Sequence, residues 1–135
     1  MTRREERKEL LYVLFETCFK TDSVEEIFED ATLGRDFVPT EYIENSLNGI
    51  LNNIETIDDK IKTNLKGWTF DRISKISVCI MRISIYELMF CDHNEIPESA
   101  SINEAVELAK EFGTDDDPSF VNGVLRSVYE ELKAL

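Results

Sequence analysis

The sequence has little of what catalytic and metal-binding sites are built from. It contains one histidine, His93, and three cysteines, Cys18, Cys79 and Cys91, among 135 residues. A structural zinc site needs four well-placed ligands, so His93 and Cys91 alone do not make one. A nucleophile elbow and a glycine-rich phosphate loop are also missing, which argues against hydrolase and nucleotide-binding classes. We therefore expect a protein without enzymatic activity, cofactor or metal.

Membrane and secretory signals are equally scarce. No apolar run approaches the roughly 18 residues that a membrane-spanning helix needs. The amino terminus lacks the uninterrupted apolar core and small-residue cleavage site of a signal peptide. The cysteines are odd in number, and each lies in an apolar stretch with helical spacing. This pattern favours buried, reduced thiols in a cytosolic protein without membrane contact.

Calcium binding is not supported either, despite the acidic run Asp115–Asp117. An EF-hand loop counted from Asp115 would place Phe120 at the glycine position and Arg126 at the bidentate glutamate position. We interpret the run as the start of a helix. Asp117 is expected to accept a hydrogen bond from a first-turn amide, and the proline that follows suits the first helical position.

Basic residues are few and confined to two segments. The net charge is −13, yet residues 1–8 carry +2 and residues 60–82 carry +5. The two remaining segments, 9–59 and 83–135, carry −11 and −9. Segregated charge is more informative than its total, because a local basic surface can bind an anionic partner within an acidic protein.

Helical spacing of apolar residues runs through almost the whole chain, with no strand alternation, repeat or low-complexity segment. Three segments match the capping box, a hydroxyl followed three residues later by glutamate: Thr2–Glu5, Ser23–Glu26 and Ser101–Glu104. The helices are expected at about 3–20, 24–33, 41–54, 56–66, 70–91, 102–112 and 118–133.

These helices predict an all-α protein of about seven helices within a single domain, 1–135. We expect two small bundles, roughly 1–67 and 68–135, that meet near Trp68. The segment 70–91 is apolar nearly all round beyond Lys75, which is typical of a helix buried on most sides. Arg82 lies inside it and is expected to form a structural ion pair with Glu104 or Glu87.

Three segments carry a resemblance to a known family. RISIYEL (82–88), SINEAVELAKEFG (101–113) and FVNGVL (120–125), in this order, resemble the NusB family of bacterial transcription antitermination factors. The pattern Arg3-Arg4-x-x-Arg7 fits the same family. The resemblance spans the chain, although the second to fourth helices match only in length and character. It implies an all-α fold of two helical bundles.

The resemblance also implies a function. NusB proteins bind boxA, a short single-stranded RNA element in ribosomal RNA leaders, together with the ribosomal protein NusE. The complex joins other Nus factors on RNA polymerase, which then resists premature termination. RNA contacts are implied at the start of the first and last helices, at Arg3, Arg4, Arg7, Lys8, Phe120 and Asn122. NusE is expected elsewhere, partly on the helix at 70–91, with candidate contacts at Phe15, Arg72, Lys75 and Ser77.

Several alternatives stay open at this point. Phe120 either stacks on an RNA base or packs in the core, and Gly123 is expected to permit close helix–helix packing. The basic residues of segment 60–82 either extend the RNA-binding surface or face an acidic patch of a partner protein. A homodimer is possible. An acidic protein–protein adaptor without RNA binding is the main competing function. A third reading, the NusB-like domain of some ribosomal RNA methyltransferases, is disfavoured because no cofactor-binding domain follows.

Overall fold

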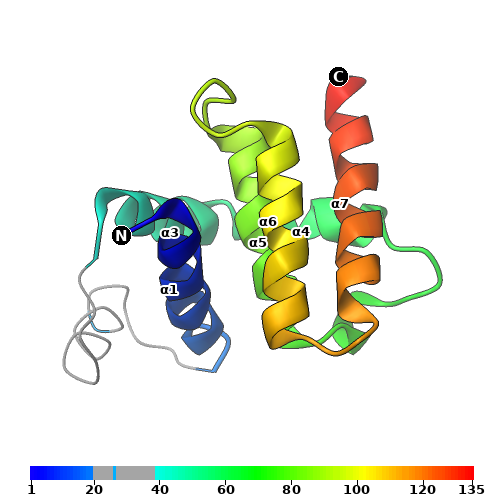
Figure 1. The fold of residues 1–135 in the computed structure, drawn as a ribbon. Coiled ribbons are helices and arrows are strands. Elements are labelled where there is room, and N and C mark those ends of the chain that lie inside the picture. The colour runs from blue at the N-terminus through cyan, green and yellow to red at the C-terminus, as the bar shows by residue number, and fades with distance from the viewer. Residues whose placement is uncertain (20–25, 27–38) are drawn as a thin grey trace.

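The computed structural model describes residues 1–19, 26 and 39–135, and within these residues it contains helices and no strand (Figure 1). The prediction of an all-α fold is confirmed. Apart from Glu26, the helix expected at 24–33 and the capping box Ser23–Glu26 lie outside the described residues. Six α-helices and one 3-10 helix are described: α1 (Arg3–Glu16), α3 (Glu41–Asn52), α4 (Ile54–Thr63), η1 (Phe70–Arg72), α5 (Lys75–Phe90), α6 (Glu98–Phe112) and α7 (Asp117–Lys133).

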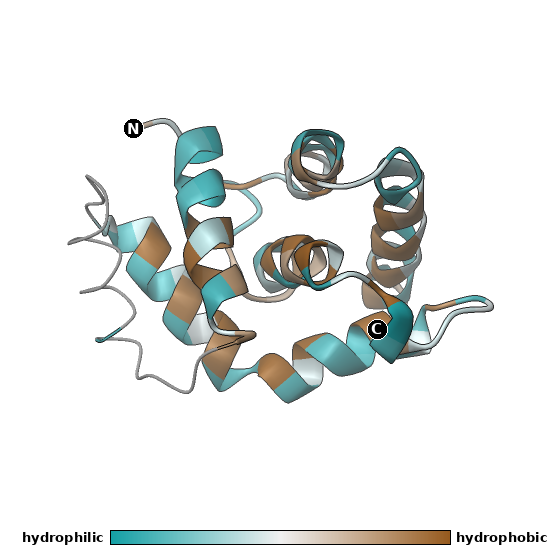
Figure 2. Cartoon of the chain, turned by 90° about the horizontal axis from the view of Figure 1, so that it is seen from below, coloured by the Kyte–Doolittle hydropathy of each residue, from teal (hydrophilic) through white to brown (hydrophobic). Residues whose placement is uncertain are grey.

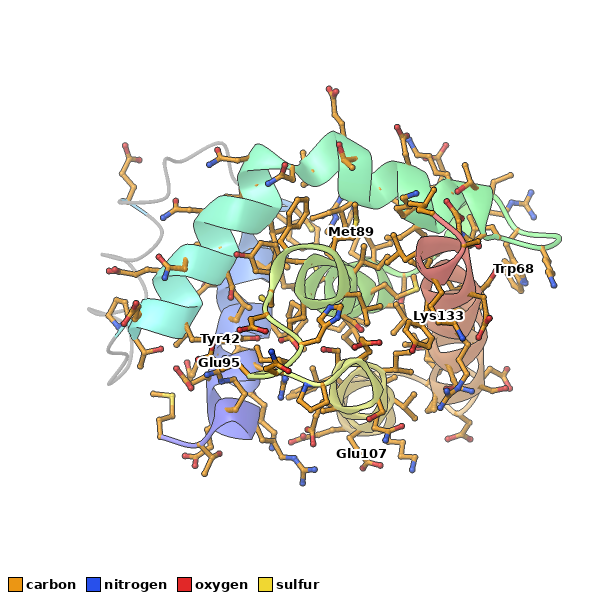
Figure 3. The ribbon with its side chains drawn as sticks, turned by 90° about the horizontal axis from the view of Figure 1, so that it is seen from above. Tyr42, Trp68, Met89, Glu95, Glu107 and Lys133 are labelled. Atoms are coloured by element: carbon orange, nitrogen blue, oxygen red, sulfur yellow. The ribbon has the colours of Figure 1, made fainter. Side chains whose placement is uncertain are left out.

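Helix α5 is the centre of the fold. It contacts each of the other described α-helices, and in Figure 3 it stands in the middle with the others around it. Its side chains at Cys79, Ile80, Met81 and Ile85 are fully buried. The surrounding helices turn hydrophobic faces inward (Figure 2). The apolar character of this segment therefore predicted its position correctly, whereas the division into two bundles stays a prediction.

Two of the capping-box predictions have clear outcomes. Thr2 caps α1, because its hydroxyl accepts from the Glu5 amide at 3.1 Å and the Glu5 carboxylate accepts from the Thr2 amide at 3.2 Å. The prediction at Ser101 is wrong. Helix α6 already begins at Glu98, and Ser101 lies inside it with its hydroxyl donating to the buried Glu87 carboxylate at 2.7 Å. The hydroxyl satisfies a buried charge instead of a helix end.

The expected helix at 70–91 is interrupted near its start. The 3-10 turn η1 comes first, and α5 begins only after Ser74, whose hydroxyl accepts from the Ser77 amide at 3.2 Å. Before it, Gly67 has a φ of 77°, a conformation that favours glycine and lets the chain turn after α4. Among the described residues, no helix is long and apolar enough to cross a membrane.

Candidate nucleic-acid interface

Two of the predicted RNA-binding cations project from α1 toward α6. The Arg4 guanidinium donates to both Glu104 oxygens at 2.8 and 2.9 Å, and the Lys8 ammonium lies 2.9 Å from a Glu111 oxygen. The hydrogen bonds to Glu104 raise the pKa of Arg4 and lower the pKa of Glu104. Both cations reach solvent, so they can exchange these carboxylates for another anion.

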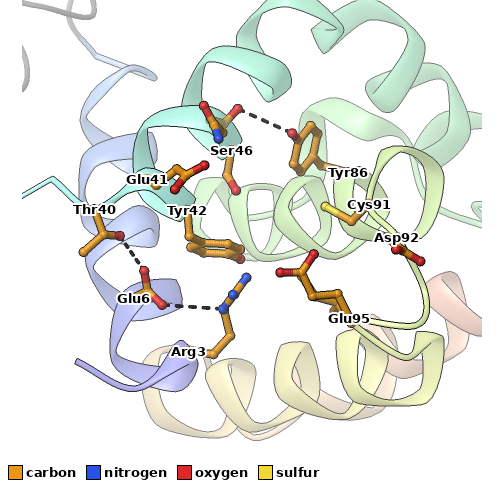
Figure 4. Close-up of a pocket in the computed structure, with 12 residues that line it drawn as sticks. Arg3, Glu6, Thr40, Glu41, Tyr42, Ser46, Tyr86, Cys91, Asp92 and Glu95 are labelled. Atoms are coloured by element: carbon orange, nitrogen blue, oxygen red, sulfur yellow. Dashed lines mark hydrogen bonds and ion pairs between the residues drawn. The ribbon is translucent and has the colours of Figure 1, made fainter.

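Arg3 points the other way, toward α3 (Figure 4). Its guanidinium carbon lies 4.2 Å from the centroid of the Tyr42 ring, and its Nε lies 3.5 Å from a Glu6 oxygen. Glu6 also accepts from the Thr40 hydroxyl. These residues line a hollow of about 460 Å³ that also includes Glu95. The four predicted cations therefore do not form one continuous strip.

Arg7 is a structural residue. Its side chain is 6% exposed, and its guanidinium donates two hydrogen bonds of 2.9 Å to the fully buried Glu87 carboxylate. Glu87 also accepts from the hydroxyls of Tyr42 and Ser101. The prediction that Arg7 belongs to an exposed cationic strip is wrong. The spacing of Arg7 from Leu10, three residues on, already placed it on the core-facing stripe of α1.

The electrostatics of this buried pair favour the charged form of Arg7. Burial acts to lower the pKa of Arg7, but the hydrogen bonds and the charge of Glu87 outweigh it and raise the pKa. Burial, together with the Glu87 charge, raises the pKa of Tyr42. Tyr42 therefore stays a neutral hydrogen-bond donor to Glu87 and a ring beneath Arg3.

The start of α7 presents an aromatic pair. Phe120 packs partly against the hydrophobic core and meets Trp68 edge to face, with ring centroids 6.2 Å apart. Trp68 is 57% exposed and projects at the edge of the molecule (Figure 3). Phe120 thus contacts the core and also supports an exposed aromatic. The sequence placed Trp68 only where the two bundles meet and indicated no role for it in binding.

Two hollows flank the aromatic pair of Trp68 and Phe120. One, of about 240 Å³, is also lined by Lys66 and Gly123, and the other, of about 280 Å³, is also lined by Arg72. Neither Lys66 nor Arg72 has an ion-pair partner within the described part of the chain. Gly123 is exposed, and a Cβ added there would meet nothing within 4 Å. The prediction that Gly123 serves helix packing is therefore wrong.

Two polar residues near this helix start are engaged locally. The Asp117 carboxylate accepts from the Thr114 amide at 2.8 Å, on the loop before α7. It therefore closes the preceding turn. The prediction that Asp117 caps a first-turn amide of α7 is wrong. Asn122 accepts from the Arg126 side chain at 3.3 Å on the surface of the same helix.

Comparison with known proteins identifies the family. The NusB family model matches residues 4–130, which is nearly the whole chain. The chain belongs to the NusB family. The transcription antitermination protein NusB of Clostridium novyi (strain NT) is 42% identical over 129 residues, covering 93% of this chain and 96% of the relative.

Solved NusB structures share the fold. NusB from T. maritima superimposes with a TM-score of 0.82 at 31% identity, covering 97% of this chain and 92% of that one. A crystal structure of the antitermination factors NusB and NusE in complex with double-stranded RNA matches with a TM-score of 0.81 at 23% identity. It covers 97% of this chain and 99% of that chain, and shows likeness of fold alone.

The four residues that the NusB resemblance assigned to partner binding differ in how far they are exposed. Arg72 and Lys75 are exposed, and Phe15 is half-buried with its ring 5.0 Å from that of Phe19. Ser77 is 1% exposed, and its hydroxyl has no hydrogen-bond partner within the described residues. Ser77 therefore presents no surface to a partner.

The ion pair predicted for Arg82 has a different partner. Its guanidinium donates to both oxygens of Asp58 on α4, each at 2.8 Å. Glu104 is not available because it binds Arg4. The prediction that Arg82 serves a structural ion pair is confirmed. The prediction that its partner is Glu104 or Glu87 is wrong, since Glu87 binds Arg7.

The two candidate RNA-binding regions of this NusB-family chain are separate in space. Tyr42, beneath Arg3, and Trp68 lie on opposite sides of the molecule in Figure 3, with α5 and α6 between them. The hollow between α1 and α6, toward which Arg4 and Lys8 project, is also lined by the carboxylates of Glu104, Glu107 and Glu111.

Proposed function

We propose that this chain is an RNA-binding transcription antitermination factor that binds boxA-type single-stranded RNA together with NusE and so supports transcription of ribosomal RNA operons. The observation that carries the proposal is the pair of the exposed Trp68 and the partly buried Phe120, flanked by two hollows and by two cations, Lys66 and Arg72, that form no ion pair with the described residues, in a chain of the NusB family. We further propose that it acts in the cytoplasm and without enzymatic activity.

The aromatic pair has the chemistry that unpaired bases need. Single-stranded RNA is bound by stacking of bases on aromatic rings, which contributes about 1–3 kcal/mol per base. Trp68 offers an exposed face, and Phe120 holds it from the core side. Lys66 lies beside the hollow on one side and suits a phosphate, whereas Gly123 leaves room for a base or sugar to approach the helix.

The cations of α1 supply a second set of contacts. Arg4 and Lys8 are held by single surface carboxylates, and such exposed pairs are weak in water. A phosphate group can therefore take the place of a carboxylate at either cation. Arg3 lies over the Tyr42 ring and beside its own hollow, where a base or phosphate is equally accessible. Arg7 has no part in this proposal, because it is buried.

NusE is assigned to a surface that adjoins the aromatic pair. Arg72, Lys75 and Phe15 remain the candidate contacts, and Ser77 is dropped because it is buried. Other Nus factors and RNA polymerase would be reached through this complex. Because Arg72 also borders one aromatic hollow, the partner and the RNA would lie close together on this side.

The test is fluorescence anisotropy of a labelled boxA-type RNA, titrated with the protein at several salt concentrations, with and without NusE. With about four phosphate contacts, log affinity should fall with log salt at a slope of roughly −3. Trp68→Ala should weaken binding about tenfold, as expected for one lost stacking contact. The matched control is Phe90→Ala, which removes another exposed aromatic, packed on Tyr86 away from both hollows.

Two outcomes would contradict the proposal. Equal RNA affinity of the Trp68→Ala and Phe90→Ala variants would remove the aromatic pair from the binding site. No saturable binding by the folded protein, even with NusE, would favour the acidic protein–protein adaptor instead. Circular dichroism of each variant separates loss of binding from loss of fold.

A further inference from the structure

Two cysteines far apart in the sequence are in contact. Cys18 follows the end of α1 and Cys79 lies on α5, and their sulfur atoms are 3.6 Å apart. Both are free thiols, with Cys79 fully buried and Cys18 partly exposed. The prediction of buried thiols is thus correct for Cys79, whereas Cys18 and Cys91 are only partly buried. A disulfide has an S–S bond of about 2.05 Å, so a modest approach of the two sulfurs would form one.

The surroundings of Cys18 are cationic and open to solvent. Its side chain lines a hollow of about 340 Å³ together with Lys75, Arg82 and Asp71. Arg82 places Nη1 3.9 Å from the Cys18 sulfur, while its other nitrogens are held by Asp58. Nearby cations favour the thiolate, which is the reactive form of cysteine.

The two thiols are inequivalent. The hydrogen bond from Cys79 lowers the pKa of Cys18 to about 6 against the effect of burial, with help from the charges of Arg82 and Lys75. The same hydrogen bond, together with burial, raises the pKa of Cys79. These opposite shifts favour a proton on Cys79 and thiolate character at Cys18.

We propose that Cys18 and Cys79 form a reversible thiol-oxidation site, in which Cys18 is the reacting thiolate and Cys79 the resolving thiol. The oxidant is a small anionic disulfide such as oxidised glutathione, whose carboxylates suit the exposed ammonium of Lys75, which lines the hollow and lies 5.7 Å from the centroid of the Phe19 ring. This site is independent of the RNA-binding proposal.

The chemistry balances as two thiol–disulfide exchanges. The Cys18 thiolate attacks one sulfur of the oxidant, whose S–S bond breaks and releases one thiolate, leaving a mixed disulfide on Cys18. Cys79 then gives up its proton and attacks the Cys18 sulfur, which releases the second small thiol. Two protein thiols are oxidised to one disulfide, and one small disulfide is reduced to two thiols.

The product would join the end of α1 to the middle of α5. The disulfide would close a loop that contains α3 and α4, and closing a long loop restricts the unfolded chain. We expect oxidation to raise the Tm by about 15 °C, from the loop-entropy relation and the entropy of unfolding typical of a domain this size.

The test uses the reduced full-length protein, incubated with oxidised glutathione at pH 7 and analysed by thiol titration, intact mass and peptide mapping. Free thiols should fall from three to one, with the loss of two hydrogens and a cross-link between the peptides of Cys18 and Cys79. Cys91→Ser, the matched control, should form the same cross-link. Cys79→Ala should stop at a mixed disulfide on Cys18, and Cys18→Ala should not react at position 79.

Several results would overturn the proposal. A wild-type protein that stops at the mixed disulfide, or cross-links only in denaturant, has no resolving thiol in its folded state. Loss of the cross-link in Cys91→Ser would assign the reaction to a different pair. Alkylation of Cys18 provides a second measurement that needs no oxidant: its pH midpoint should lie near 6 and rise in Cys79→Ala, and an unchanged midpoint would remove Cys79 from the site.

Discussion

Replacing Arg7 with alanine should destabilise the fold far more than replacing Arg3, although both arginines lie in the first turns of α1. In Arg7→Ala the buried Glu87 keeps two hydroxyl donors but loses two hydrogen bonds and the one cation that pairs with it among the described residues. Breaking a buried ion pair on one side costs about 3–5 kcal/mol. A domain unfolds with only about 5–15 kcal/mol, so this loss is a large fraction of the total.

Arg3 provides the matched control. Its side chain is 37% exposed, with one ion pair to Glu6 and a cation–π contact to Tyr42, so Arg3→Ala should change stability by about 1 kcal/mol or less. By the usual entropy of unfolding per residue, Arg7→Ala should lower the Tm by roughly 10–18 °C.

Urea denaturation followed by circular dichroism measures both variants. Midpoints that agree within error for Arg7→Ala and Arg3→Ala would refute the reasoning, because they would mean that the Glu87 site tolerates an uncompensated charge. A double-mutant cycle sharpens the test. Arg7→Ala combined with Glu87→Gln should cost less than the sum of the single changes by more than about 1 kcal/mol, since contacting residues are not additive.

Three further predictions rest on the same measurement. Gly123→Ala should stabilise α7 by about 0.5–1 kcal/mol, because the added Cβ meets open space, and it should weaken RNA binding. Gly49→Ala should instead destabilise the fold, because its Cβ would overlap an aromatic ring of α5. A stabilised Gly123→Ala with unchanged RNA affinity would remove this surface from the site. Ser77→Ala should leave stability unchanged or slightly higher, since its hydroxyl is unpaired within the described residues; a loss above about 1 kcal/mol would reveal a missed partner. Asp58→Asn should cost about 1–3 kcal/mol by leaving the half-buried Arg82 charge without its carboxylate, and a neutral effect would show that solvent compensates it.

The helices were predictable because their periodicity is local. The apolar content of the segment around α5 predicted its central position, since a helix apolar on all sides must be surrounded. Helix ends were less certain, because a hydroxyl three residues before a glutamate is compatible with two roles. Thr2 caps a helix, whereas Ser101 binds the buried Glu87. Which role applies depends on a carboxylate supplied by another helix.

The partners of charged residues were not predictable from one sequence. Arg82 binds Asp58, 24 residues earlier, and Glu104 binds Arg4, 100 residues earlier. Such pairs depend on how helices pack in space, and several carboxylates are equally plausible from spacing alone. The burial of Arg7 was different, because the helical stripe of α1 already contained it. The periodicity indicated a core-facing position for Arg7, but its charge favoured the prediction of an exposed one.

These pairings bear on how an acidic protein would hold RNA. A phosphate that binds Arg4 or Lys8 displaces Glu104 or Glu111, so one anion replaces another and the net electrostatic gain is small. A phosphate at Lys66 displaces no carboxylate within the described chain. Stacking on Trp68 involves no charge, whereas an RNA at Arg4 and Lys8 lies beside the carboxylates of α6. We therefore expect most of the affinity to come from the aromatic end of the molecule, with the α1 cations contributing more to the path of the RNA than to the strength of its binding.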